Sequence, residues 1–327
     1  MPNSWRTLRR RILTPNTRET LLDTRGFHKK NRAAQDLLET VGRTFLEGYG
    51  HAMEARTTAE AEERLERIPT QFRGFAYEGA GMGFAMLDGL PFGGRGSVDR
   101  FLAGRGDRHN YMVYVGIGWA MARLPRFRWP DIDRIDPLLR WLVLDGYGFH
   151  QAYFRTDRYV HGQYQDVGLP WPAHDHPGYV PNAIDQGIGR ALWFIGGTEA
   201  DLVATMIEKF PQHRRGDLYS GAGLAASYAG GAEQDELLVL RERAGVHQPM
   251  VAQGSAFAAE ARIRAGLLVP HTAVATGILC GQAPAEAAQI THDARQAAVA
   301  TAGKPAYEVW RQAIAAEFAA PGGVDRP

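Results

Sequence analysis

The sequence IPTQFRGFAYEGAG, residues 68–81, has a counterpart in FPQHRRGDLYSGAG, residues 210–223. The two stretches share a proline, an Arg-Gly pair, a tyrosine and a closing Gly-Ala-Gly at matching positions. Two distant segments of one chain agree at so many positions when they are copies of one structural unit. The sequence therefore predicts an internal repeat.

The repeat is marked by a Gly-x-Gly that is followed by an alanine-rich and aromatic run. Its copies begin 30 to 41 residues apart, near the ~34-residue period of two-helix tetratricopeptide repeats. The preceding segments of several copies also have helical spacing and stop at Pro69 and Pro211. We expect an all-α protein of six such two-helix units, forming an open solenoid or a closed α/α toroid. The first glycines of the copies are Gly79, Gly116, Gly146, Gly187, Gly221 and, in a degenerate copy, Gly254.

These glycines need a physical reason, because glycine inside a helix is less stable than alanine by roughly 0.5 to 1 kcal/mol. One reason would be that neighbouring helices approach too closely there for any side chain. Another would be that backbone amides at a helix start stay open to a ligand. We favour close packing.

The repeat divides the chain into three parts. Residues 1–57 are interpreted as a helical lead-in, residues 58–302 as the repeat domain, and residues 303–327 as a tail that we expect to fray. Within the repeat domain, residues 155–183 break the rhythm with four prolines. This connection could be a lid over a central cavity, or it could link two halves of the array.

Composition narrows the class of protein. Of 327 residues, 45% are apolar, and 37 basic residues nearly balance 36 acidic ones, which argues against nucleic acid as a partner. The single cysteine, Cys280, excludes an internal disulfide framework. The sequence contains no run near the ~18 apolar residues of a membrane span. We therefore expect a cytoplasmic protein.

Residues 4–13, SWRTLRRRIL, qualify that expectation. In a helix, Trp5, Leu8 and Ile12 would share one face, with arginines around the rest. Such a helix can lie on an anionic membrane surface, which would give peripheral membrane contact. The alternative is that its apolar face docks on the protein itself.

Standard catalytic motifs give little support to a known chemistry. Gly221-Ala-Gly-Leu-Ala-Ala fits a dinucleotide fingerprint, but no buried strand precedes it. The sequence contains no phosphate-binding loop, nucleophile elbow or His-Glu-x-x-His pattern. His174 and His176, with aspartates nearby, resemble zinc ligands, but histidines beside loop prolines are more often free of metal. The sequence predicts no metal site and identifies no cofactor.

The residue before each Gly-x-Gly is the best candidate for a functional position, because five of the six are polar. If the array closes on itself, these side chains converge on one mouth. An aromatic wall with a few converging polar groups is typical of a small-molecule site. The alternative is that they cap helix starts or face solvent. The six residues are Glu78, Val115, Asp145, Gln186, Ser220 and Gln253.

Roles follow from residue type and register. Carboxylates and imidazoles can act as general acids or bases, and the candidates are Glu78, Asp145 and His150. Polar and aromatic residues at or near the same register are expected to bind substrate. They are Tyr77, Tyr114, Gln151, Asp185, Gln186, Tyr219, Gln253 and Glu260.

Several long strings resemble a known group of proteins. They are RRILTP (10–15), ETLLD (19–23), FRGFAYEGA (72–80), YVGIGWAMARLP (114–125), WLVLDGYGFHQAYF (141–154), DQGIGRALWF (185–194) and QGSAFAAEAR (253–262). Over about residues 10–294 the chain is similar to the UnbL-type enediyne biosynthesis proteins, a bacterial family of unassigned activity.

The resemblance implies a step in making an enediyne core, after a linear conjugated polyene leaves its polyketide synthase. It implies an apolar polyketide intermediate as the ligand and other proteins of that pathway as partners. The family offers no established catalytic residues to transfer. Two readings stay open: a protein that binds, and catalyses or templates the cyclisation of, a polyene, or a non-catalytic repeat scaffold that assembles pathway proteins.

Overall fold

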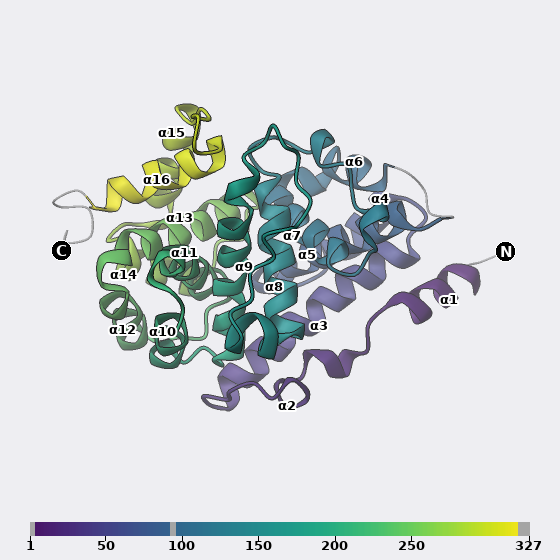
Figure 1. The fold of residues 1–327 in the computed structure, drawn as a ribbon. Helices are drawn as coiled ribbons and strands as arrows, with labels where there is room; N and C mark the ends of the chain where they lie inside the picture. Colours follow the sequence, from purple (N-terminus) through teal and green to yellow (C-terminus); the bar gives the residue numbers. More distant parts are fainter. Residues whose placement is uncertain (1–3, 92–95, 320–327) are drawn as a thin grey trace.

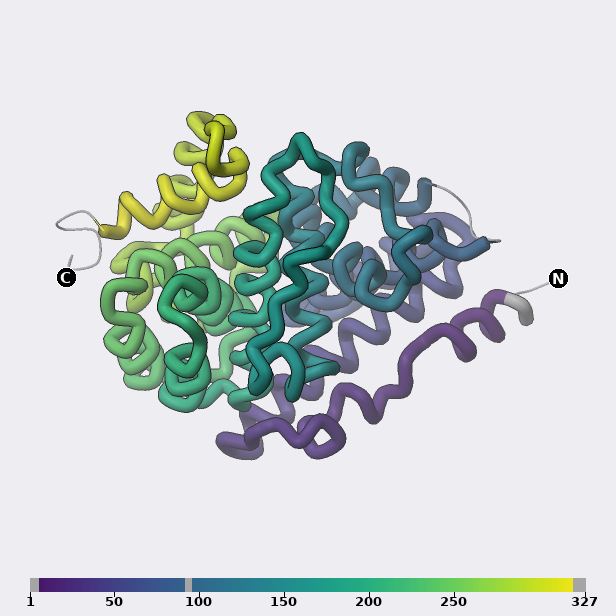
Figure 2. Tube along the Cα trace, in the orientation of Figure 1, coloured from purple at the N-terminus to yellow at the C-terminus, as the bar shows by residue number. Residues whose placement is uncertain are grey.

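The computed structural model describes residues 4–91 and 96–319, and every regular element in these residues is helical. This confirms the predicted all-α repeat fold. Seven long helices form one array, in which each packs on the next in chain order (Figures 1 and 2). They are α3 (Arg32–Glu54), α5 (Thr70–Gly89), α7 (Asn110–Met121), α8 (Trp141–Phe154), α9 (Val180–Ile195), α11 (Gln212–Ala229) and α13 (Gln248–Arg264).

Shorter helices lie outside the two ends of this array. Helices α4 (Thr58–Leu65) and α6 (Ser97–Leu102) flank its first half. Its second half is flanked by α10 (Ala200–Glu208), α12 (Gln234–Ala244) and α14 (Pro270–Leu279), which pack in series. The links on either side of α8 contain only short 3-10 or π turns. The predicted two-helix unit therefore holds at both ends of the array but not in its middle.

The longer of these links, residues 155–179, packs on the outside of α8 and α9 (Figure 1). The Trp171 ring lies 4.9 Å from the ring of Trp141, and Arg140 pairs with Asp175 at 2.7 Å. The link lines neither interior pocket described below. Of the two predicted roles, it therefore fits a connection and not a lid.

Adjacent array helices touch backbone to backbone at the repeated glycines. A β-carbon on the first glycine of each Gly-x-Gly would lie only 1.8 to 2.1 Å from a carbonyl oxygen of the preceding helix. A β-carbon on the second glycine would lie 2.0 to 2.8 Å from the backbone of the following helix. No side chain fits at either position, which confirms close packing as the reason for the glycines.

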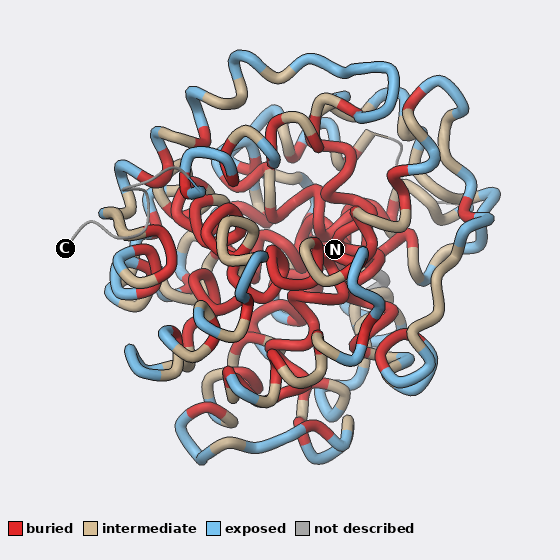
Figure 3. The backbone as a smooth tube through the Cα atoms, turned by 60° about the vertical axis from the view of Figure 1, so that its left-hand side comes forward, coloured by how far each residue is buried: buried red, intermediate tan, exposed pale blue. Residues whose placement is uncertain are grey.

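Helix α3 joins the array through the same contact, although its Gly48-Tyr49-Gly50 has another register: Gly48 faces the following helix, as the second glycine does in the other copies. A β-carbon on Gly48 would lie 1.9 Å from the carbonyl oxygen of Ala76, and one on Gly79 would lie 1.9 Å from that of Phe45. The array thus begins inside the segment interpreted as a lead-in, one helix earlier than predicted. Figure 3 shows that the buried residues follow these inner helices.

Residues 14–31, which we call the N-terminal strap, cross one edge of the array. Arg25 and the backbone N–H of His28 donate hydrogen bonds to carbonyl oxygens at the C-terminal ends of α8 and α9. Lys30 donates to the carbonyl oxygen of Gly231, just after α11, at 2.7 Å. The strap therefore ties together helices that lie far apart in the sequence.

The C-terminal end differs from its prediction. Residues 306–319 do not fray but form α16 (Ala306–Ala319), which packs with α15 (Pro284–Gln296) on α13. Trp310 anchors it, because its indole is buried and donates to the Thr291 carbonyl oxygen at 2.8 Å. Residues 320–327 lie outside the described part of the chain.

Helix α1 (Ser4–Leu13) docks on α3 through its arginines. Arg10 pairs with Glu54 at 2.7 Å, and Arg9 donates to the Met53 carbonyl oxygen. Leu8 and Ile12 are 45% and 66% exposed, so neither docks on the protein as the alternative prediction required. The Trp5 side chain lies outside what the structure describes. Among the described residues, the helices are all too short or too polar to cross a bilayer.

The glycine contacts predict a large and local effect on stability. Gly146→Ala places a methyl group 2.0 Å from the carbonyl oxygen of Val115, so the free energy of unfolding should fall by about 3 kcal/mol or more. Gly277→Ala is the matched control, because Gly277 is exposed in α14 and a methyl group there would meet no atom within 4 Å. We expect it to raise stability by up to about 1 kcal/mol. Chemical denaturation of both variants tests this, and equal stabilities would contradict the packing.

Candidate functional site

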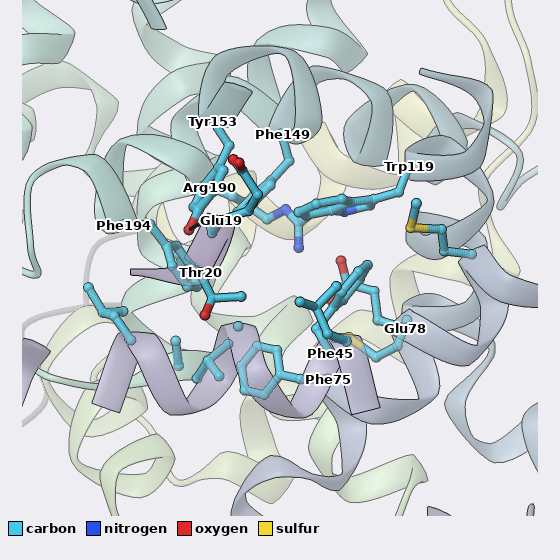
Figure 4. A pocket seen from close by; sticks show the side chains of 18 of the residues that line it. Glu19, Thr20, Phe45, Phe75, Glu78, Trp119, Phe149, Tyr153, Arg190 and Phe194 are labelled. Carbon is cyan, nitrogen blue, oxygen red and sulfur yellow. Dashed lines mark hydrogen bonds between the residues drawn. The ribbon is translucent and has the colours of Figure 1, made fainter. Parts of the chain in front are cut away.

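The inner faces of six array helices, α3 through α11, enclose a central pocket (Figure 4). It contains about 880 Å³ of space free of atoms, part of it open to solvent. Exposed Arg123 and half-exposed Glu19 line its solvent side, together with Pro15 and Thr20 of the strap. A large, mostly apolar hollow of this kind is the usual form of a small-molecule site.

Aromatic rings form most of the wall. The Trp119 ring centroid lies 4.5 Å from that of Phe45 and 5.2 Å from that of Phe149. Phe194 packs edge-on against Phe149 at 5.2 Å, and Phe75 continues the wall on the opposite side (Figure 4). Flat rings at these spacings suit a planar, conjugated ligand, which can stack on their faces.

A smaller pocket of about 440 Å³ adjoins the first between α7, α8, α9, α11 and α13. The two hollows share a wall, since four residues line both of them. These residues are Met112, Arg190, Leu224 and Tyr228. The interior of the array is therefore one region divided by a few side chains.

Many residues of the pocket wall stand at one fixed distance in sequence from the first glycine of each repeat copy. The residue three positions after the first glycine lines one of the two pockets in every copy. These residues are Met82, Trp119, Phe149, Arg190, Leu224 and Phe257. Sequence reasoning missed this register, although one signal was present: Arg190 is the only charged residue among six otherwise apolar positions.

Glu78 is the one predicted acid or base that lines the central pocket. Its residue is 5% exposed, and burial raises the pKa of its carboxyl to about 7. Arg190 opposes this rise, Asp145 adds to it, and the Trp119 indole lowers the pKa slightly. A carboxyl that titrates near neutral pH can both give and take a proton.

Asp145 lines the smaller pocket, and its carboxylate forms an ion pair with Arg190. Its carboxylate Oδ1 is 2.8 Å from Arg190 Nη2, and both side chains are more than 90% buried. Burial raises the pKa of Asp145, and the guanidinium opposes that rise. The guanidinium carbon also lies 5.1 Å from the centre of the Phe149 ring. Asp145 therefore holds Arg190 in place at the junction of the two hollows.

His150 and Gln151 lie beside the central pocket but do not line it. The His150 ring packs edge-on against Trp119 at 5.5 Å, and its two nitrogens have no hydrogen-bond partner among the described residues. Burial, helped by Arg123, lowers the His150 pKa to about 3, so the ring is neutral. Gln151 donates to the Tyr147 hydroxyl at 2.8 Å.

Gln186 and Gln253 belong to a buried polar network that includes residues of α16. Arg311 of α16 enters it and donates to Asp217 at 2.7 Å and to Gln253 at 3.3 Å. Gln186 accepts a hydrogen bond from Tyr307, also of α16, at 2.9 Å. These predicted binding residues thus have protein partners and fasten α16 to the array.

The predicted tyrosines face away from both pockets. Tyr77 donates to Glu66 at 2.7 Å and stacks on His109. Tyr219 donates to the Arg243 carbonyl oxygen of α12, and Tyr114 lines a separate surface pocket near α6. The aromatic wall that the sequence predicted therefore exists, but other residues make it.

The last two predicted binding residues differ in their surroundings. Asp185 accepts two hydrogen bonds from Arg214, at 2.8 and 2.6 Å, between α9 and α11. Glu260 lines the smaller pocket, where His292 lies 2.8 Å away and the Tyr111 hydroxyl 3.4 Å away. Only Glu260 of this pair faces the interior space.

The histidine-rich link shows no metal arrangement. His174 is exposed and lies 3.3 Å from Asp133, while the Asp175 carboxylate is buried against Arg140 and the Trp171 indole. Across residues 4–91 and 96–319, no three metal-ligating side chains gather as a metal ion would need.

The Glu78 carboxyl should make stability depend on pH. Its pKa is about 7 in the folded protein against 4.5 in an exposed chain, so its stabilising contribution is full below pH 4.5 and is lost as pH rises through 7. Arg190, Asp145 and Tyr228 are the charged or titratable groups that face it. Glu78→Gln should therefore gain about 2 to 3 kcal/mol relative to wild type between pH 5 and pH 8. Denaturant unfolding of both proteins measures this, and parallel pH profiles would refute it.

Comparisons with known proteins identify a family for this chain, but the function of that family is unknown. No curated protein and no solved structure gave a significant match. A family profile described as a protein of unknown function, DUF1702, matches residues 4–318. The chain therefore belongs to the DUF1702 family.

Proposed function

We propose that this protein binds a linear polyene or polyyne intermediate in its central pocket during maturation of an enediyne core, and holds it for ring closure. The observation that carries the proposal is the aromatic pocket enclosed by α3 through α11. The pathway comes from the sequence resemblance. A conjugated chain is flat, apolar and easily oxidised, so a narrow aromatic hollow both fits it and keeps water away.

Burial supplies the affinity in this proposal. At about 25 cal/mol per Å², a ligand that buries roughly 300 Å² of apolar surface gains about 7 kcal/mol before the cost of immobilising it. Because that cost is subtracted from about 7 kcal/mol, we expect a dissociation constant weaker than about 10 μM for such a ligand. No charged group of the ligand is needed.

Glu78 is the residue to which we assign acid–base chemistry, because it alone of the three predicted candidates lines this pocket. Asp145 is engaged by Arg190, and the neutral His150 ring lies behind Trp119. The alternative, a non-catalytic scaffold for pathway proteins, would be favoured by a broad exposed groove along the array. The enclosed aromatic pocket favours binding of a small molecule.

The direct test is to mix purified protein with the polyene released by the cognate synthase, to follow its absorption spectrum, and then to measure its mass. A spectral shift at unchanged mass supports a carrier, and a changed mass supports an enzyme. Diphenylhexatriene, a fluorescent hydrocarbon polyene, gives a second readout of binding. No response to either ligand would overturn the proposal and favour the scaffold.

A matched pair of variants locates the site. Phe149→Leu removes a ring from the pocket wall and should weaken diphenylhexatriene binding at least about tenfold, which is about 1.4 kcal/mol. Phe101→Leu removes an equally buried ring that lines neither interior pocket, and it should leave binding unchanged. Fluorescence titration of both variants measures the difference. Equal losses would place the ligand elsewhere.

A further inference from the structure

Arg190 is an unusual occupant of the pocket wall. It replaces an apolar residue at the inward register of the repeat, and its side chain is 8% exposed. Figure 4 shows Arg190 and Glu78 reaching into the space between the aromatic rings from different sides. A buried cation must be paired, and Asp145 pairs with Arg190 while the guanidinium still lines both pockets.

Some of the polar atoms around this space lack partners. Arg190 Nε and the Tyr228 hydroxyl are buried and make no hydrogen bond within the described residues, whereas the Trp119 indole faces the Glu78 carboxyl. Arg190 Nη2 faces Asp145 at 2.8 Å, but the pair is not aligned as a hydrogen bond. Buried donors without acceptors destabilise a protein by about 1 to 3 kcal/mol each. An acceptor oxygen from a ligand would satisfy them.

The charges of Arg190, Asp145 and Glu78 decide whether the ligand that supplies this oxygen is neutral or negatively charged. Arg190 and Asp145 cancel each other, and the neighbouring Glu78 carboxyl takes up its proton near neutral pH. A neutral ligand leaves the balance intact. A carboxylate ligand would add an uncompensated negative charge beside two acidic side chains in a desolvated pocket, which is strongly unfavourable.

We propose that the central pocket selects conjugated chains that end in an uncharged carbonyl group, whose oxygen is bound by Arg190 and Glu78. This inference rests on the proposed polyene binding and names the end of the chain that the pocket recognises. Arg190 borders both hollows, so the carbonyl end lies innermost and the chain extends along the aromatic wall toward Glu19 and Arg123. The cation and the acid both polarise the carbonyl, which prepares its conjugated chain for attack or proton loss.

Three ligands of equal chain length test the selection: a linear tetraene methyl ketone, the tetraene carboxylate and the tetraene hydrocarbon. Each competes with diphenylhexatriene for the wild-type protein. We expect the ketone to bind at least about tenfold more tightly than either of the others, because only the ketone supplies a neutral acceptor. Its carbonyl stretching band in the infrared should shift to lower frequency on binding.

A double variant identifies the residue responsible. Arg190→Met combined with Asp145→Asn removes the cation without leaving an unpaired buried carboxylate. It should lose the preference for the ketone over the hydrocarbon. Asp145→Asn alone keeps the guanidinium but leaves its charge uncompensated, so this variant should still prefer the ketone over the hydrocarbon and should bind the carboxylate more tightly than wild type does. Circular dichroism of both variants verifies that they are folded.

The outcomes separate the two proposals. If the three ligands bind wild type equally, or the carboxylate binds best, carbonyl selection is overturned while polyene binding stands. If the double variant keeps the ketone preference or the infrared band does not move, Arg190 is not the binding group. If neither the ligands nor diphenylhexatriene bind, polyene binding itself is overturned. The ketone comparison on wild type decides the matter even if the double variant does not fold.

Discussion

The structure depends on one contact, the approach of two helix backbones at a glycine. In each Gly-x-Gly, the first glycine contacts the backbone of the preceding helix. In most copies a second glycine, two positions further on, contacts the backbone of the following helix. These two positions lie about 200° apart around a helix, so the helices join in a row. Because no side chain separates the backbones, the row is tight and its inner faces are brought together around one space.

Much of this could be predicted from the sequence, because the glycine pairs and their spacing are local. The all-α class, the repeat and the order of the inner helices follow from them. Helix α3 was missed although it contains Gly48-Tyr49-Gly50, and only Gly48 of this pair touches a neighbouring array helix. The link over α8 and α9 lacks a second helix, and its length alone could not tell a connection from a lid.

The candidate site was less predictable, because the positions of the glycines do not determine which face of each helix lines the interior. The residue before each Gly-x-Gly lies inside, but two of these residues, Gln186 and Gln253, are bonded to Tyr307 and Arg311 of α16, which is far away in sequence. The inward stripe was instead marked by the residues three positions after the first glycine, which are apolar in every copy except the one with Arg190. Glu78 and Asp145 were found from the sequence, whereas Arg190 needed the three-dimensional packing. The same array therefore contains one polar group that is tied to α16 and another that borders the pockets.

The N-terminal strap has a consequence for how the pocket comes into being. Its hydrogen bonds reach α8, α9 and the turn after α11. Residues that the ribosome synthesises early are therefore held in place by residues that it synthesises much later. Inner helices can pack on one another as they leave the ribosome, since each touches its neighbour in chain order. The strap cannot complete its contacts until residue 231 has been synthesised. The pocket is thus completed late in synthesis. In an unfinished chain the strap does not yet cover the aromatic interior, which is exposed to solvent.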